Sequence, residues 1–218
     1  MSFDFGVVLG QWPMLLQGVL LTAALTLAAA LLGTTLAAAC AWVRVEGPRA
    51  LRVVVGVYVE FMRNTPFIIQ LFFVYFGLPS LGVRFSPATA SILAMVLNLG
   101  AYGCEILRAG IEATPRGQVE AAHSLALNRW QTFSRVVLPP ALARVWPALV
   151  SQIIIVMLGS AVCSQISAEE VSYAANLISG RTFRSFESYI VATAIYLALA
   201  VALRQTLYWL GPRWLFRH

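Results

Sequence analysis

Long apolar runs separated by short polar intervals follow one another along the whole chain. Between charged residues, uncharged stretches cover 5–43, 64–83, 85–104, 145–168 and 188–203. A helix needs about 20 mostly apolar residues to cross the hydrocarbon core of a membrane. We therefore predict an all-α integral membrane protein in which residues 1–218 form one transmembrane domain of five spanning helices. The expected spans are about 14–43, 53–78, 88–107, 141–162 and 187–211.

The composition supports a membrane location. Of the 218 residues, 60% are hydrophobic and 11% are charged, whereas soluble domains carry about 25% charged residues. All 15 basic residues are arginine. A nucleotide-binding P-loop needs a lysine, so that kind of site is excluded from this chain and any energy from ATP must come from another protein. The three cysteines lack metal-ligand spacing, so neither a metal nor a cofactor is expected on this chain.

The arginines are distributed unevenly between the two sides of the predicted membrane. If the loop over 44–52 is cytoplasmic, five alternating spans place the N-terminus outside and the C-terminus inside. The inner side then holds ten arginines and the outer side holds three. This bias obeys the positive-inside rule and accounts for the net charge of +6 without a nucleic-acid partner. The inner set is Arg44, Arg49, Arg52, Arg108, Arg116, Arg129, Arg135, Arg144, Arg213 and Arg217, and the outer set is Arg84, Arg181 and Arg184.

The second predicted span carries charged and polar residues in its interior. Glu60 and Arg63 are three residues apart, so they share a helix face and can form an ion pair. Arg63 lies about 16 Å into a helix that starts at residue 53, and charged groups at that depth usually face a bundle interior or a water-filled path. Pro66 lacks a backbone donor, so Asn64-Thr65-Pro66 predicts a kink lined by polar atoms. The alternative is an ion pair that only braces the kink.

The longest polar interval runs from Glu120 to Pro140. Its first part is rich in good helix formers, and apolar residues at 121, 122, 125 and 126 form one stripe. Pro139 and Pro140 are expected to end or kink this helix. Local chemistry alone favours a short surface helix that joins two spans.

A second short helix, on the outer side, is predicted between the last two spans, over 167–179. Ser167 followed by Glu170 fits a capping box at its start. Gly180 is a plausible helix stop.

Motifs in the polar interval and in the second span resemble those of ABC importer permeases. Glu120-Ala121-Ala122, then Ala126, then Val136 and Leu138-Pro139 keep the spacing of the family's EAA loop, with Ala126 in place of Gly and Val136 in place of Ile. The runs 61–66 and 70–79 resemble the signature FRGTPLLVQLFFVYFGLP of the polar amino-acid group, with Asn64 in place of Gly. The run 101–112 resembles the segment that leads into the EAA loop.

The resemblance implies a type I ABC importer permease that moves a polar amino acid or an opine-like derivative across the inner membrane. It implies a cytoplasmic coupling helix within 113–140, a separate ATPase dimer that binds ATP and Mg²⁺, a second permease subunit, and a periplasmic or extracellular substrate-binding protein. The residues it assigns to coupling are Arg116, Glu120, Ala121, Ala122, Ala126, Leu138 and Pro139. Those it assigns to the translocation path or gate are Glu60, Arg63, Asn64, Thr65, Pro66, Gln70, Glu105 and Ser160.

One departure from the family bears on the second permease. Leu158 and Gly159 occupy the place where the family usually has Lys-Asp or Lys-Asn. Polar groups on that helix are expected to help hold a charged substrate, so we favour a heterodimer in which a paralogue makes more of the substrate contacts.

Two other classes of membrane protein are alternatives to an importer permease, an ion-coupled transporter and a membrane-embedded enzyme. An ion-coupled secondary transporter of small polar solutes would need an acidic residue deep in a span, and Glu60 is the only candidate. A membrane-embedded enzyme is disfavoured because the His, Asp and Glu residues do not cluster at ligand spacing.

Overall fold

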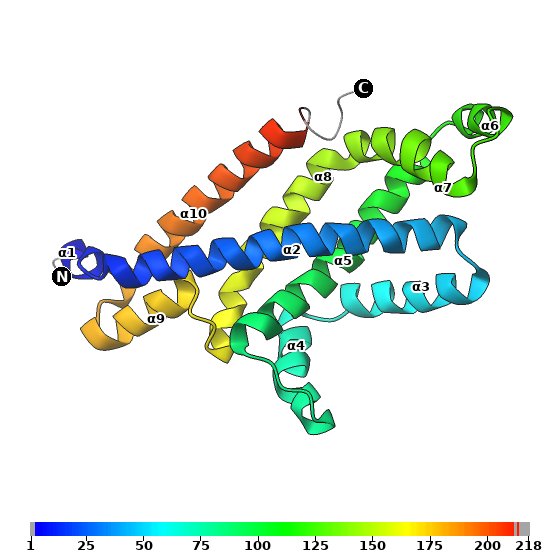
Figure 1. Ribbon diagram of the computed structural model, residues 1–218. Coiled ribbons are helices and arrows are strands. Elements are labelled where there is room, and N and C mark those ends of the chain that lie inside the picture. The colour runs from blue at the N-terminus through cyan, green and yellow to red at the C-terminus, as the bar shows by residue number, and fades with distance from the viewer. Residues whose placement is uncertain (1–2, 212, 214–218) are drawn as a thin grey trace.

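Long helices dominate the computed structural model, which describes residues 3–211 and 213 and contains no strand among them (Figure 1). Within those residues, four helical stretches are long and apolar enough to cross a membrane: α2 (Trp12–Glu46), α5 (Pro87–Glu112), Arg129–Ile166, and α10 (Ser185–Leu210). A bent pair of helices supplies a fifth span if the two are counted as one. The shorter helices include α1 (Phe5–Leu9), α6 (Arg116–Ser124) and α9 (Val171–Thr182). Arg217, predicted to lie on the inner side, falls outside the described residues.

α2 and α5 lie side by side along the centre of the bundle (Figure 1). Small residues let them approach closely, as is common in membrane helix pairs. A methyl group added at Gly33 of α2 would lie 2.9 Å from the Leu99 side chain, and one added at Gly103 of α5 would lie 2.8 Å from the Ala37 side chain. The α2–α5 contact therefore fixes the frame on which the other helices pack.

The second predicted span is broken rather than merely kinked. α3 (Arg49–Arg63) meets the helical stretch Phe67–Leu81, which begins with α4 (Phe67–Phe72), at an angle of 111°. The amide of Gln70 donates to the carbonyls of Met62 (2.7 Å) and Thr65 (3.0 Å) at the break. Pro66 cannot continue the backbone ladder, and this side chain takes up carbonyls that the break leaves free. The kink predicted at Asn64-Thr65-Pro66 is therefore a full break of the helix, and it falls at the predicted residues.

The double proline Pro139-Pro140 lies within a helical stretch and does not end it. α7 (Arg129–Thr132) continues through a π-helical turn, Phe133–Val137, into α8 (Leu138–Gly159). Pro139 and Pro140 lie in the first turn of α8, directly after this π-helical turn, so their missing backbone N–H groups fall where the hydrogen-bond register of the helix changes. Of the two predicted outcomes, an end or a kink, the structure excludes an end at these prolines, because the helical stretch begins at Arg129 and continues through them.

The predicted outer helix is present as α9, but its cap differs from the prediction. Ser167 has a left-handed backbone (φ 64°) and precedes the helix, while Glu170 is the N-cap and accepts a hydrogen bond from the backbone of Tyr173 at 2.9 Å. Glu170 is fully buried and also accepts a hydrogen bond from the Tyr196 hydroxyl of α10. The capping box is therefore wrong, because the acidic residue itself takes the N-cap position. Gly180 does not stop the helix, which ends at Thr182.

Glu170 lies outside the spans and is expected to make stability depend on pH. Burial raises the pKa of this carboxyl above its usual range, against the hydrogen bonds that favour its charged form. Because the folded-state pKa is raised, protonation of Glu170 stabilises the fold. This contribution is complete at pH values below the usual carboxyl pKa and is lost as the pH rises through the raised pKa. Glu170→Gln should therefore flatten the fall in thermal midpoint as the pH rises above the usual carboxyl range. Identical slopes for the two proteins would contradict this assignment.

The two ends of the bundle carry different elements. The α2–α3 turn, α6 and α7 lie at one end, and α1 and α9 lie at the opposite end (Figure 1). Arg44, Arg49 and Arg116 therefore share one end, while Arg181 belongs to the other. A partner on that side of the membrane would contact the end that carries α6.

Candidate coupling and translocation sites

α6 projects from the end of the bundle and carries the Glu-Ala-Ala motif (Figure 1). Its Ala122 is only 3% exposed and holds the helix to the rest of the chain, whereas Glu120 and Ala121 are exposed. Leu125, directly after the helix, is 76% exposed.

The turn after α6 explains why the family has glycine at the Ala126 position. The backbone N–H of Leu127 bonds to the carbonyl of Ala122 (3.2 Å), and that of Ala126 bonds to the carbonyl of His123 (2.9 Å). This is the Schellman arrangement, which places a left-handed residue just past the helix end. Ala126 is that residue, with φ 56°. An alanine there is strained, because its Cβ crowds the backbone.

Ala126→Gly is expected to raise the stability of the α6 turn. Relief of the left-handed strain contributes about 1–2 kcal/mol, and the larger entropy of glycine in the unfolded chain offsets about 0.4–1 kcal/mol of it. The thermal midpoint in detergent should therefore rise. Ala121→Gly, in the helical part of α6, should lower the midpoint, since glycine costs about 1 kcal/mol in a helix. A lower midpoint for Ala126→Gly would contradict the strain argument.

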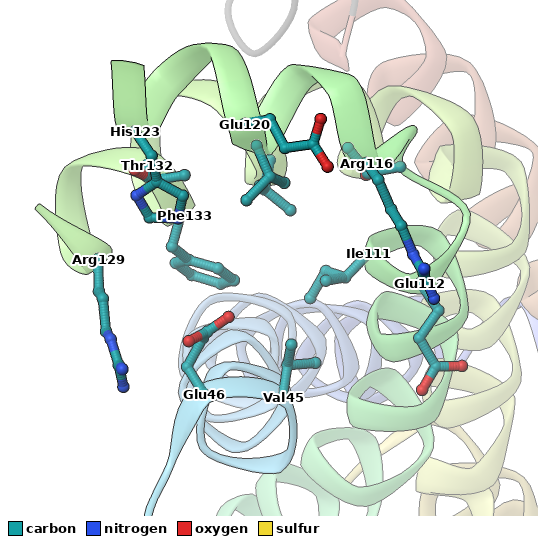
Figure 2. A pocket seen from close by; sticks show the side chains of 13 residues that line it. Val45, Glu46, Ile111, Glu112, Arg116, Glu120, His123, Arg129, Thr132 and Phe133 are labelled. Atoms are coloured by element: carbon teal, nitrogen blue, oxygen red, sulfur yellow. The ribbon is translucent and has the colours of Figure 1, made fainter. Parts of the chain in front are cut away.

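A pocket of about 500 Å³ lies beneath α6, and we call it the coupling pocket. Figure 2 shows it bordered by α6, by the end of α2 and by the end of α5. Its lining residues are Val45, Glu46, Ile111, Glu112, Thr114, Arg116, Val119, Glu120, His123, Arg129, Thr132, Phe133 and Val137. Two of the predicted coupling residues, Arg116 and Glu120, thus border a cavity, while Leu138 and Pro139 belong to the start of α8.

Three arginines from three helices converge on Glu105 of α5. The carboxylate of Glu105 lies 2.8 Å from Arg108 of the same helix, 3.7 Å from Arg44 of α2 and 3.8 Å from Arg63 at the end of α3. Its side chain is only 18% exposed. Tyr102 adds to the group, because its hydroxyl donates to the Arg63 carbonyl and its ring lies under the Arg63 guanidinium. We call Glu105 and these three arginines the Glu105 cluster.

The predicted pair between Glu60 and Arg63 is wrong. The Glu60 carboxylate accepts a hydrogen bond from the Asn64 amide at 3.1 Å, and the Arg63 guanidinium turns to Glu105. The break after Arg63 ends the helix there, so Arg63 can reach a neighbouring helix. Glu105 also pairs with Arg108, three residues farther along the same helix. Nothing in the sequence spacing indicated Arg44, which is 61 residues from Glu105 and meets it only when α2 packs on α5.

The other predicted path residues divide into exposed and buried sets. At the break, Glu60, Arg63, Asn64 and Pro66 are exposed and Thr65 is partly exposed. Gln70 is 5% exposed, because it supports the break and accepts a hydrogen bond from Asn98 at 3.0 Å. Ser160 is fully buried, and its hydroxyl has no hydrogen-bond partner within the described residues. The break therefore presents a polar edge, supported from inside by Gln70.

The family model described as "binding-protein-dependent transport system inner membrane component" matches residues 30–215. The chain belongs to this family. The permease is 32% identical over 204 residues to the arginine transport system permease protein ArtQ of Bacillus subtilis (strain 168), covering 93% of each chain. It is 30% identical over 223 residues to the nopaline transport system permease protein NocM of Agrobacterium fabrum (strain C58), covering 96% of this chain and 92% of the relative.

The fold likeness agrees with the family match. The crystal structure of an amino acid ABC transporter with histidines superposes with a TM-score of 0.86 at 31% identity, covering 98% of this chain and 100% of that one. The predicted type I ABC importer permease fold is thereby confirmed. The chain is the translocation subunit of an ATP-driven importer and a multi-pass inner-membrane protein, and the secondary-transporter alternative is disfavoured. Membership implies a separate ATPase, a second permease and a substrate-binding protein.

Proposed function

We propose that this permease forms half of the route by which a polar amino acid or an opine-like derivative enters the cell, and that α6 receives the force of ATP hydrolysis. The names of its relatives, which transport arginine and nopaline, support this class of substrate. ATP and Mg²⁺ are bound by the ATPase dimer and not by this chain. The observation that carries the proposal is α6, with Ala122 anchored and with Glu120 and Leu125 free to meet a partner.

The proposed orientation places the N-terminus outside and the C-terminus in the cytoplasm. It is supported by the gathering of Arg44, Arg49, Arg52 and Arg116 at the end of the bundle that carries α6. Positive residues favour the cytoplasmic side of a membrane, so α6 faces the ATPase. α1 and α9 then face the binding protein.

The translocation path runs along the break after α3. Its exposed polar edge comprises Glu60, Arg63, Asn64 and the backbone before Pro66. Non-helical backbone at membrane depth is tolerated where it lines a water-filled cavity, and a charged substrate requires such a lining. Glu105 holds Arg63 at this edge, so the Glu105 cluster keeps a charged side chain in place along the path. Gln70 supports the break, and Ser160 offers a hydroxyl that a rearranged α8 can present.

The second permease is proposed to be a paralogue rather than a second copy of this chain. Leu158 is 44% exposed, and a methyl group added at Gly159 would meet no atom of the described residues within 4 Å. An apolar side chain and an open space offer no charged group to a charged substrate. A paralogue with charged residues at these positions would supply that contact. Purification of an active complex that contains one kind of permease chain would refute this assignment.

Uptake by purified transporter in proteoliposomes tests the proposed function. The complex that co-purifies with this permease is reconstituted with its binding protein outside and ATP inside, and accumulation of radiolabelled L-glutamine and L-arginine is measured. The proposal predicts accumulation that requires both ATP and the binding protein. Accumulation that survives removal of ATP and follows an imposed proton or sodium gradient would contradict it.

A further inference from the structure

An apolar cleft of about 1070 Å³ runs along the bundle between α2, α8 and α10, and we call it the α10 cleft. All three helices belong to stretches that are long and apolar enough to cross a membrane, so the cleft lies at membrane depth. α10 is the least buried of the four long stretches, with 17% of its apolar segment buried by the rest of the described chain. The walls of the cleft include Leu27, Leu31, Ala38, Leu149, Leu203 and Leu207.

The walls of the α10 cleft offer an occupant few polar atoms. No charged residue lines the cleft among the described residues. Four of its five threonines donate their hydroxyls to carbonyls of their own helices, and the fifth accepts a hydrogen bond from the backbone of Val171; they are Thr26, Thr34, Thr35 and Thr206, and Thr22. A cavity holds water only where several polar groups bind it. The chemistry of the walls therefore favours a hydrocarbon chain.

The end of the cleft nearest α7 is aromatic and basic. Trp42 of α2 and Trp130 of α7 line the cleft there, and their rings meet edge to face at 5.6 Å. On α10 the last lining residue is Leu210. Arg213 follows it, with its guanidinium 4.3 Å from the centre of the Trp209 ring. Tryptophan and arginine at the end of an apolar span are typical of the depth of lipid headgroups.

The arginines of α10 and of the turn after it have no counter-charge nearby in the sequence. Arg204 lies within the span, three residues before Leu207, and is therefore its neighbour on the helix surface. Neither Arg204 nor Arg213 has a carboxylate of another described residue within 4 Å. No acidic residue follows Glu187 in the sequence. A charged residue inside a span is costly and usually marks a site with a partner of opposite charge, and a phosphate group would supply that charge.

A helix of the second permease is the other apolar molecule that could fill the cleft. Two permeases that share a route meet at the faces that line it, and the proposed path follows the break after α3. No residue of α3 or α4 lines the α10 cleft. An apolar helix would also leave Arg204 and Arg213 without an anion, whereas a phospholipid carries both a hydrocarbon chain and a phosphate. The observations therefore favour a lipid.

We propose that the α10 cleft binds one phospholipid of the inner leaflet, with an acyl chain in the cleft and the phosphate at Arg204 and Arg213. The lining residues of α10 extend from Leu199 to Leu210, about 16 Å at 1.5 Å per residue, which is close to half of the roughly 30 Å hydrocarbon core. Phosphatidylglycerol, which carries a net negative charge, binds more tightly than zwitterionic phosphatidylethanolamine. The lipid holds α10 against α2. Only the choice of leaflet rests on the proposed orientation.

Native mass spectrometry of the delipidated permease tests the site. The probes are phosphatidylglycerol and phosphatidylethanolamine with the same palmitoyl and oleoyl chains, and the wild type should bind one phosphatidylglycerol. Ala202→Trp places a large ring in the cleft and should weaken binding of both lipids at least about tenfold. Ala194→Trp is the matched control, because Ala194 is exposed on the same helix and does not line the cleft; it should bind as the wild type does.

A double variant tests the headgroup contact, independently of any effect of Ala202→Trp on folding. Arg204→Gln together with Arg213→Gln should weaken phosphatidylglycerol at least about tenfold and remove the preference over phosphatidylethanolamine. Arg49→Gln together with Arg52→Gln is the control for the same loss of charge, since both arginines are exposed on α3, away from the cleft. This control should leave the preference unchanged.

Thermal unfolding in detergent supplies a second readout. Added phosphatidylglycerol should raise the midpoint of the wild type and of Ala194→Trp, but not that of Ala202→Trp, because a ligand stabilises only the state that binds it. Equal binding by Ala202→Trp and Ala194→Trp would mean annular lipid only and would overturn the inference. An unchanged lipid preference in the Arg204 and Arg213 double variant would overturn it too.

A crosslinking experiment on the assembled transporter tests for the alternative occupant. The native cysteines are buried, so a thiol-reactive crosslinker at Ala202→Cys reports on what lies in the cleft. An adduct with the second permease would show a protein there and overturn the inference, and the lipid predicts no such adduct. None of these measurements needs uptake. Failure of the proposed function would therefore leave the lipid site standing, and failure of the lipid site would leave normal uptake unexplained by neither result.

Discussion

Replacing Glu105 with glutamine is expected to abolish uptake and to lower the thermal midpoint of the permease. The substitution leaves Arg44, Arg63 and Arg108 pointing at one another without the carboxylate that gathers them. Because the Glu105 side chain is only 18% exposed, water replaces the lost charge poorly. Loss of this partly buried charge should cost between the about 0.5 kcal/mol of an exposed pair and the about 3 kcal/mol or more of a buried pair broken from one side, and here three helices lose their shared contact.

Thermal unfolding in detergent and uptake in proteoliposomes measure the two effects separately. Glu112→Gln is the matched control, since its side chain is 57% exposed and bridges only Arg108; an exposed pair contributes about 0.5 kcal/mol. Arg63→Ala should lose uptake with a smaller change in midpoint, because Arg44 and Arg108 continue to neutralise Glu105. Normal uptake by Glu105→Gln would contradict the assignment of this cluster to the path.

Glu120→Arg is expected to reduce uptake more than about tenfold while the permease still inserts and assembles. Glu120 is an exposed acidic residue on α6, and juxtaposing like charges at an interface costs several kcal/mol. ATP hydrolysis and transport should separate, so that the ratio of substrate moved to ATP hydrolysed falls.

Gln118→Arg provides the control for the same change of charge on the same helix. Gln118 is exposed, lies two residues from Glu120 and therefore points to the other side of α6. It should retain most of the uptake. Unchanged transport by Glu120→Arg, or equal loss in the two variants, would contradict a specific docking role for the Glu-Ala-Ala face.

The sequence predicted the elements whose signals are local. The lengths of the apolar runs indicated four long helical stretches, because burial in a membrane requires a fixed length. Their ends are displaced by a few residues, except that the stretch expected from residue 141 begins at Arg129. The break at 64–66 was also predictable, because proline removes a donor wherever it stands. The spacing of the motif predicted a short helix in the polar interval, and α6 contains the Glu-Ala-Ala residues.

Features that depend on helices meeting in space were not predictable. Glu60 and Arg63 had ideal spacing for a pair, yet packing of α3 on α5 gave Arg63 a better buried partner in Glu105. Pro139 and Pro140 are helix-stop residues by local chemistry, but in the structure one helical stretch, Arg129–Ile166, continues through them. Ala126 differs from the glycine of the family pattern by one methyl group. Its left-handed backbone shows that this methyl group strains the turn, which the sequence alone does not reveal.

Site-directed photocrosslinking from Leu125 tests most directly whether α6 is held by an ATPase. The three native cysteines are buried, so Leu125→Cys places a single accessible thiol at a side chain that is 76% exposed. A thiol-reactive photocrosslinker attached there, in membranes that contain the assembled transporter, is predicted to yield an adduct with the ATPase. Phe183→Cys, which is 90% exposed after α9 at the opposite end, should yield none. An ATPase adduct from position 183, or none from position 125, would contradict the account.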